Sequence, residues 1–307
     1  MKLSVALVSS TCLLYALPAP ADTLSAWDEN DYWGGWSDKY YTNHTRFGYT
    51  YDSATNPGEH YFFSFGQEMY TAAEQYSKVP PANDHPYAGV FYVSAGFAQS
   101  SADILNAVEL QLGIIGPSAR AGECQHDYHS LINEYTPSGW DSQVKDQPAV
   151  NLLSETRMRA GLSGTLGEGY ASDAIVRGFF ALGTVRTQLS GGVQFRYGIN
   201  LPQDFGYVPM RQSTSVVIKP NTNASLYAFA DFQADLNIYD VTLGGELLRK
   251  HESDIYAYPF TAEFTVGLTA VYGNCSVTFF QSFRSRDFSS ADRPFFCFGG
   301  IRLSYSF

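Results

Sequence analysis

Strict alternation of apolar and polar residues marks the C-terminal end of the chain. Positions 301, 303, 305 and 307 are Ile, Leu, Tyr and Phe, whereas positions 302, 304 and 306 are Arg, Ser and Ser. This period of two is typical of a strand with one apolar and one polar face. Residues 260–272 repeat the pattern. Strands of about 10 residues with aromatic ends fit a membrane-spanning barrel better than a soluble β-sandwich.

The same alternation, followed along the whole chain, predicts twelve strands. An even number places both chain ends on the periplasmic side, and closure of an antiparallel barrel leaves no free edges. We therefore expect an all-β fold, a twelve-stranded antiparallel transmembrane β-barrel, as a single domain over residues 22–307. The expected spans are 23–32, 40–51, 59–70, 87–98, 105–115, 147–162, 173–187, 190–201, 224–238, 259–272, 275–286 and 295–307.

Long connections are expected after odd-numbered strands, on the outer side of the membrane. Residues 123–135 contain no Gly or Pro and are predicted to form a short helix in the longest of these connections. The connection 202–223 would be an unusually long periplasmic turn. The expected outer connections are 33–39, 71–86, 116–146, 239–258 and 287–294.

The first 21 residues have the composition of a secretory signal peptide. Lys2 gives the basic start, residues 3–17 form an apolar run, and Ala19-Pro20-Ala21 fits a cleavage site before Asp22. A run of about 15 residues is too short for a membrane-spanning helix. We therefore expect residues 1–21 to be a signal peptide and the protein to be exported.

Beyond that segment the chain is acidic, with 18 basic against 30 acidic residues and a net charge of −12. An acidic surface argues against nucleic acid as a partner, because phosphate binding needs basic residues. The three remaining cysteines are Cys124, Cys275 and Cys297, an odd number. Cys275 and Cys297 are expected at opposite ends of one hairpin, roughly 20 Å or more apart. We predict three free thiols.

Four polar clusters lie where the outer half of the first six strands is expected. Such residues, taken one at a time, are more often solvated loop residues or lumen-facing groups. Their convergence on one rim is nevertheless typical of a catalytic site. The clusters are residues 28–31, residues 38–43, residues 67–71 with 83–89, and residues 113–143.

Two histidines stand out in the fourth cluster. His126 and His129 are three residues apart and would share a helical face. Gln125 and His129, four apart, are well placed to interact, whereas Glu134 can act with His129 only if the helix ends between them. The sequence has no G-x-S-x-G motif and no zinc-type Cys/His pattern. A histidine base with hard oxygen ligands for Ca²⁺ fits metal-assisted ester hydrolysis.

In order and spacing, these clusters resemble the outer-membrane lipid A 3-O-deacylase family, the LpxR-like proteins, over essentially the whole mature chain. The resemblance implies a twelve-stranded barrel and Ca²⁺-dependent hydrolysis of the 3′-linked acyloxyacyl ester of lipid A. The pieces that carry it are Glu29-Asn-Asp31, Tyr41-Thr-Asn43, Asp84-His-Pro-Tyr-Ala-Gly89, Gly113-Ile-Ile-Gly-Pro-Ser-Ala119, Gln125, His129, Trp140, Gln143 and the terminal Phe307.

The resemblance also implies roles for individual residues. His129 matches the base that activates water, and Asn30 and Asp31 match an essential Asn-Asp pair. Thr42 matches a functional hydroxyl, and Lys78 is the candidate for a lysine in the second outer loop. Since adjacent strand residues point to opposite faces, Asn30 and Asp31 can serve one site only if the strand ends or bulges there.

The remaining expected site residues bind substrate or metal. Gln125 and Tyr41 are expected to contact the substrate, and Asp31 and Glu134 to bind Ca²⁺. In the best-known family member an acidic residue follows the histidine by six, but that position is Tyr135 here. The family site lies outside the barrel wall, beneath an outer-loop helix.

The implied partner is lipid A or lipopolysaccharide, and the implied location is the outer membrane, crossed many times by a monomer. Two alternatives stay open at this point. One is a non-catalytic barrel that acts as a pore or adhesin, and the other is an outer-membrane phospholipase. The acyl position and chain length are not fixed by the sequence.

Overall fold

The computed structural model describes residues 22–35, 37–165, 169–245 and 254–307, so the predicted signal peptide lies outside the described residues. The strands are β1 (Thr23–Asn30), β2 (Tyr40–Asp52), β3 (Glu59–Thr71), β4 (Ala88–Ser100), β5 (Ile104–Ile115), β6 (Gln147–Thr165), β7 (Tyr170–Gly183), β8 (Arg186–Ile199), β9 (Ala224–Asp240), β10 (Phe260–Tyr272), β11 (Cys275–Ser285) and β12 (Phe295–Ser306). The helices are α1 (Tyr32–Gly35), α2 (Ala121–Ile132) and α3 (Val241–Gly244), with 3₁₀ turns η1 (Pro117–Ala119), η2 (Gly139–Ser142) and η3 (Met210–Gln212).

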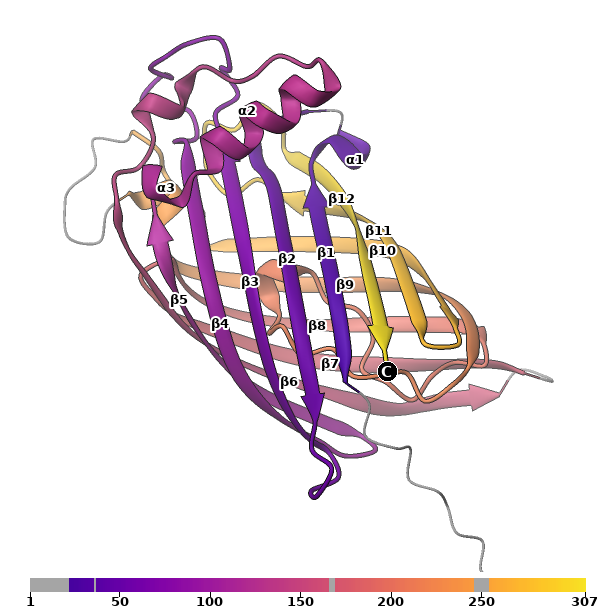
Figure 1. The fold of residues 1–307 in the computed structure, drawn as a ribbon. Helices are drawn as coiled ribbons and strands as arrows, with labels where there is room; N and C mark the ends of the chain where they lie inside the picture. Colours follow the sequence, from indigo (N-terminus) through magenta and orange to yellow (C-terminus); the bar gives the residue numbers. More distant parts are fainter. Residues whose placement is uncertain (1–21, 36, 166–168, 246–253) are drawn as a thin grey trace, which may run out of the picture.

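The twelve strands form one closed antiparallel barrel, in which sequence neighbours pair and β1 closes against β12 (Figure 1). The predicted fold is therefore confirmed. The largest shift in bounds is at the β7–β8 hairpin, whose turn lies at Thr184 and Val185, before the predicted turn. Both residues are β-branched and therefore resemble strand residues in the sequence.

The two faces of the barrel wall differ in polarity, as the alternation in the sequence predicts. In β1, Leu24 is half-exposed on the outer face, whereas Trp27 and Glu29 are buried on the lumen face. Polar side chains in the lumen satisfy one another, because an unpaired buried charge is costly. Buried ion pairs in the lumen are Arg177 with Asp231, Arg196 with Asp173, and Arg284 with Asp235 and Glu263.

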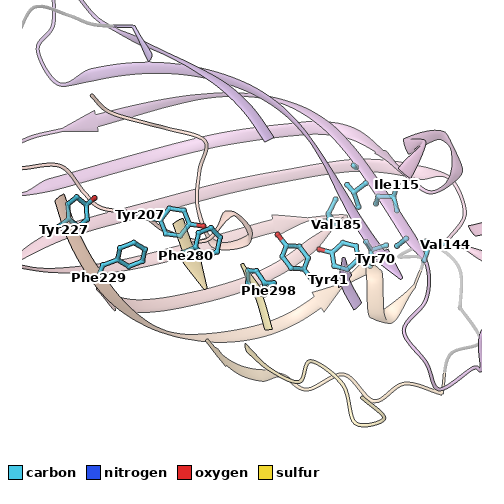
Figure 2. Packing of buried hydrophobic residues seen from close by; sticks show 14 residues of the cluster. Tyr41, Tyr70, Ile115, Val144, Val185, Tyr207, Tyr227, Phe229, Phe280 and Phe298 are labelled. Carbon is cyan, nitrogen blue, oxygen red and sulfur yellow. The ribbon is translucent and has the colours of Figure 1, made fainter. Parts of the chain in front are cut away.

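A row of aromatic side chains also runs through the lumen, as Figure 2 shows. Tyr41 and Tyr70 lie at one end of the row, with ring centroids 5.7 Å apart. Phe298 packs edge-on against Tyr41 at 5.1 Å. Tyr207 packs against Phe280 at 4.6 Å further along. These rings link β2 and β3 with β11, β12 and the 200–223 connection across the closure of the barrel.

The connection between β8 and β9, residues 200–223, folds back into the lumen. Residues 205–217 of this segment are all buried, and η3 lies within it. The expectation of a long periplasmic turn at 202–223 is therefore wrong in its placement. We call residues 200–223 the plug.

Lumen carboxylates hold the plug by its backbone. Met210 N–H donates to Glu29 at 2.8 Å, Thr214 N–H to Glu155 at 2.9 Å, and Ser215 N–H to Glu109 at 2.6 Å. Each interaction satisfies both a buried acid and a buried amide, which explains why this long connection enters the barrel.

The helices gather at the end of the barrel opposite the C-terminus (Figure 1). Helix α2 begins and ends a few residues before the predicted 123–135. It ends at Ile132 because Asn133 adopts a left-handed conformation with φ of 60°. None of the described helices is long and apolar enough to span a membrane. The three described cysteines are free, as predicted.

Candidate active site

Helix α2 packs against the outer face of the wall at the start of β4. Gly89 makes this close approach possible, since a Cβ at this position would lie 2.6 Å from the Ala121 Cβ. Gly116 N–H donates to the Gly89 carbonyl at 2.8 Å and fixes the chain where β5 leads into α2. The predicted helical cover over the wall is therefore present.

Gln125 is the buried polar residue on the wall side of α2. Its Nε2 donates to both carboxylate oxygens of Asp38, at 2.9 and 3.0 Å. Its Oε1 accepts from the Trp140 indole N–H at 2.7 Å. The amide nitrogen thus holds Asp38 against α2, while the bond from Trp140 fixes the orientation of the amide.

His129 lies one helical turn after Gln125 and also faces Asp38. Its Nδ1 lies 2.6 Å from the Tyr135 carbonyl, and its Nε2 lies 3.4 Å from Asp38 Oδ2. The carbonyl can only accept, so Nδ1 carries the proton and Nε2 is left as the base. His126, in contrast, is exposed.

The Asn30-Asp31 pair lies where β1 ends, so the two side chains do not alternate across a strand. Asn30 Oδ1 accepts from the Tyr32 N–H at 2.7 Å. Asp31 Oδ2 accepts from the Ser37 hydroxyl at 2.8 Å and the Lys39 N–H at 2.7 Å. Asp31 Oδ1 is buried and has no hydrogen-bond partner among the described residues.

Thr42 connects β2 to the same cluster. A bulge between Tyr41 and Asn43 interrupts the pairing of β2 with β3 at this residue. The Thr42 and Thr71 hydroxyl oxygens lie 2.7 Å apart, and the Thr71 hydroxyl donates to the Asp38 carbonyl at 2.8 Å. The Thr42 carbonyl accepts from the Asp31 N–H at 3.2 Å.

Burial shapes the electrostatics of the two acids. It raises the pKa of Asp38 from 3.8 to about 6, although His129 and Gln125 act in the opposite direction and Glu134 adds to the rise. Burial, followed by repulsion from Asp38, also raises the pKa of Asp31 well above its usual value. Two buried, mutually repelling carboxylates favour a cation or a proton at this place.

Four of the predicted site residues therefore meet around Asp38: Asp31, Thr42, Gln125 and His129. Asn30 adjoins Asp31. Sequence reasoning placed Asp38 in the second polar cluster but gave it no role. No periodicity signals its contact with α2, because the two residues that bind it lie in a different outer connection.

The other predicted site residues lie elsewhere. Tyr41 faces the lumen, where its hydroxyl donates to Glu29 at 2.5 Å. Lys78 is exposed in the connection between β3 and β4. Glu134 is exposed, but its backbone N–H donates to the His129 carbonyl at 2.8 Å. The structure does not bring Tyr41 or Lys78 to Asp38.

Hard oxygen atoms make this cluster suitable for Ca²⁺. The donor without a partner is Asp31 Oδ1, and the second carboxylate is Asp38. Within the described ranges, no three His, Cys, Asp or Glu side chains form a metal-binding group. A cation here would thus use hydroxyl, amide or water oxygens besides Asp31.

Polar side chains continue from the cluster onto the outer face of the wall. Asp28 Oδ2 accepts from the Thr45 hydroxyl at 2.7 Å and from Asn43 Nδ2 at 3.0 Å. Gln67, the next residue across from Thr45, donates to the Ala119 carbonyl at 2.6 Å. Asp28, Thr45 and Gln67 form a polar row across three strands, which we call the outer polar row.

Closure of the sheet and its apolar outer face define the class as a membrane-spanning β-barrel. A sequence model of one family in this class, described as outer membrane protein LpxR, matches residues 3–307. The chain therefore belongs to the LpxR family and crosses the outer membrane many times.

Of the two solved structures compared next, the first shows the same fold. LpxR from Salmonella typhimurium superposes with a TM-score of 0.80 at 15% identity, covering 93% of this chain and 100% of that chain. The β domain of the Bordetella autotransporter BrkA has a TM-score of 0.46 at 11% identity, covering 94% and 100% respectively. The comparison with curated proteins found no match.

Proposed function

We propose that this protein hydrolyses an ester of lipid A and removes the 3′-linked acyloxyacyl chain. The observation that carries the proposal is the His129–Asp38 pair, held by Gln125 beneath α2 on the outer face of the wall. A lipid of the outer leaflet would reach this position without passage through the lumen. Membership of the LpxR family supports lipid A as the substrate.

The mechanism follows from the protonation of His129. Nε2 takes a proton from a water molecule, and the water oxygen attacks the ester carbonyl carbon. The Asp38 carboxylate, 3.4 Å away, stabilises the imidazolium that forms. The imidazolium then gives its proton to the departing sugar oxygen. The products are the acyloxy fatty acid and a free hydroxyl on the glucosamine.

Ca²⁺ is the cofactor we propose for this site. Asp31 would hold it through Oδ1, with Asp38 as the neighbouring negative charge, while the predicted ligand Glu134 lies on the solvent side. When bound, the ion would polarise the ester carbonyl as a Lewis acid. Asn30 and Thr42, whose side chains lie beside these acids, would orient the substrate.

The experiment compares lipid A from cells that express the wild type, His129→Ala or His126→Ala, using mass spectrometry. Removal of a general base lowers the rate by about 10²–10⁴-fold, so His129→Ala should leave lipid A fully acylated. The exposed His126 is the matched control and should behave like the wild type. Identical acylation in wild type and His129→Ala would refute the proposal, and fatty acid release from phospholipid alone would reassign the substrate.

A further inference from the structure

A hollow of about 720 Å³ lies in the outer face of the barrel wall. Its lining is almost entirely apolar and comes from β1–β4 and β11–β12. Ala26, Phe47 and Phe65 form its floor as cross-strand neighbours, and the two phenylalanine rings stack at 5.2 Å. Both rings are about half-exposed on the membrane side of the wall. The volume lies within the roughly 300–1,000 Å³ of small-molecule sites.

Small side chains on the lumen face explain why the wall is hollowed here. Ser25, Gly48 and Ser64 face inward, and Ser64 Oγ lies 2.8 Å from Ser215 Oγ of the plug. A Cβ on Gly48 would lie 2.8 Å from Ser25 Oγ, so a larger residue here would require the serine side chain to move. The wall therefore lies close to the plug, and its outer surface is concave. The hollow therefore depends on the small residues of the lumen face and on the apolar residues of the outer face.

The hollow leads directly to the candidate active site. The outer polar row lies two residues from this apolar row, on the same three strands. Asp28 lies beyond Ala26 on β1, Thr45 beyond Phe47 on β2, and Gln67 beyond Phe65 on β3. Two residues correspond to roughly 7 Å along a strand. Gln67 is bonded to the segment that leads into α2, which carries His129. The polarity of the outer face thus changes abruptly within one row.

We propose that the hollow binds an acyl chain of lipid A while the ester of that lipid lies at the outer polar row. This inference rests on the proposed function, because it takes as occupant the lipid whose ester reaches His129. A hydrocarbon chain matches the apolar lining, and its carbonyl end matches the polar row. The bound acyl chain would differ from the other lipid around the barrel because it contacts a preformed concave surface.

One test fills the hollow. Ala26→Trp places a large ring on its floor, and Ala230→Trp is the matched control on an outward position of β9, between Phe195 and Val266. Ala26→Trp should lower kcat/KM for lipid A deacylation in mixed micelles by about tenfold. The added ring would exclude part of the acyl chain, and loss of contact for roughly two methylene groups has an effect of this size. The control should keep wild-type kinetics. Wild-type kinetics for Ala26→Trp would overturn the inference.

A second test does not depend on catalysis, so it separates this inference from the proposed function. p-Benzoylphenylalanine replaces Phe65 in the hollow or, as control, Phe195, which is exposed to a similar degree. Each protein is irradiated in phosphatidylcholine vesicles containing a minor fraction of lipid A. The ratio of lipid A to phospholipid adducts should be severalfold higher at position 65. Equal ratios, or phospholipid enrichment at 65, would contradict the inference, and heat-dependent gel mobility verifies folding.

Discussion

Asp38 lies in the first outer connection, and it contacts α2 through its side chain and β3 through its backbone carbonyl. Its carboxylate accepts from Gln125 and faces His129, and its carbonyl accepts from Thr71. A histidine beside a carboxylate is a stronger base in the transition state, because the imidazolium is stabilised. Asp38 therefore supports the base as a charged partner at 3.4 Å, while the Tyr135 carbonyl orients the ring.

Asp38→Asn should lower kcat by about 10–100-fold, because it removes the charge that stabilises the His129 imidazolium. The amide preserves the size of the side chain, so α2 should remain docked. Asp127→Asn, an exposed position on the same helix, is the control. Deacylation rates measured at saturating lipid A test the effect, and an unchanged kcat would remove Asp38 from the mechanism.

The raised pKa of Asp38 predicts a pH dependence. The carboxylate carries its charge only above about pH 6, so kcat/KM should fall as the pH drops through that value. Because the folded pKa exceeds the usual 3.8, the stability gained from the protonated form is lost as the pH rises towards 6. A pH profile that is identical in the wild type and Asp38→Asn would assign the titration to another group.

Local spacing in the sequence pointed to Gln125 and His129, whereas Asp31 and Thr42 were identified only through the family resemblance. Gln125 and His129 share a helical face, and the structure shows both against one acid. Asp38 has no such signature, because its contacts depend on how two outer connections fold over the wall. Tyr41 shows the opposite problem: it adjoins Thr42 in the sequence, but the strand directs it into the lumen.

The position of α2 depends on how the helix as a whole packs against the barrel wall and on how it ends. The helix contacts the wall at Ala121, where Gly89 leaves space for it. Its other end is fixed by Asn133 in the left-handed conformation, which brings Tyr135 back to His129. Any displacement of this helix changes the distance between His129 and the wall.

Gly89→Val should reduce deacylation while the barrel remains folded. The added side chain would displace Ala121, and a shift of about 1 Å at a catalytic group can cost on the order of 100-fold in rate. Gly178→Val is the matched control, since a Cβ on this outward-facing β7 glycine would meet nothing within 4 Å. Kinetics combined with heat-dependent gel mobility test this prediction; equal activities of the two variants would contradict it.

The elements themselves were largely predictable, because a period of two is imposed by the two faces of the wall. The largest shift in strand bounds is at the β7–β8 hairpin, where the turn residues Thr184 and Val185 are β-branched. The start of α2 depends on the left-handed Arg120, with φ of 58°, which no local pattern indicates. Periodicity predicts where an element lies, whereas its ends depend on single backbone conformations.

At the scale of the whole molecule, the plug determines whether the lumen is open. Its residues 205–217 are buried inside the barrel, and their backbone is tied to carboxylates on β1, β5 and β6. The sequence predicted only an unusually long periplasmic turn at residues 202–223. Its place could not be predicted, because its partners are scattered over strands that lie far apart in the chain.

A filled lumen predicts the absence of a stable open channel. Purified wild-type protein in planar bilayers should show no steady ion conductance, because the plug blocks the path along the barrel axis. Replacement of residues 203–219 by a short Gly-Ser linker should produce conductance if the variant folds. Steady conductance of the wild type would contradict the prediction and favour the pore alternative.

Tyr207 of the plug lies where the barrel closes on itself. Its hydroxyl donates to Glu29 of β1 at 2.9 Å, while its ring packs against Phe280 of β11 and faces Arg302 of β12. One side chain thus touches both sides of the junction between the first and last strands. The plug therefore stabilises the contact between the first and last strands from inside the barrel. The same side chain thus contributes both to closure of the barrel wall and to filling of its interior.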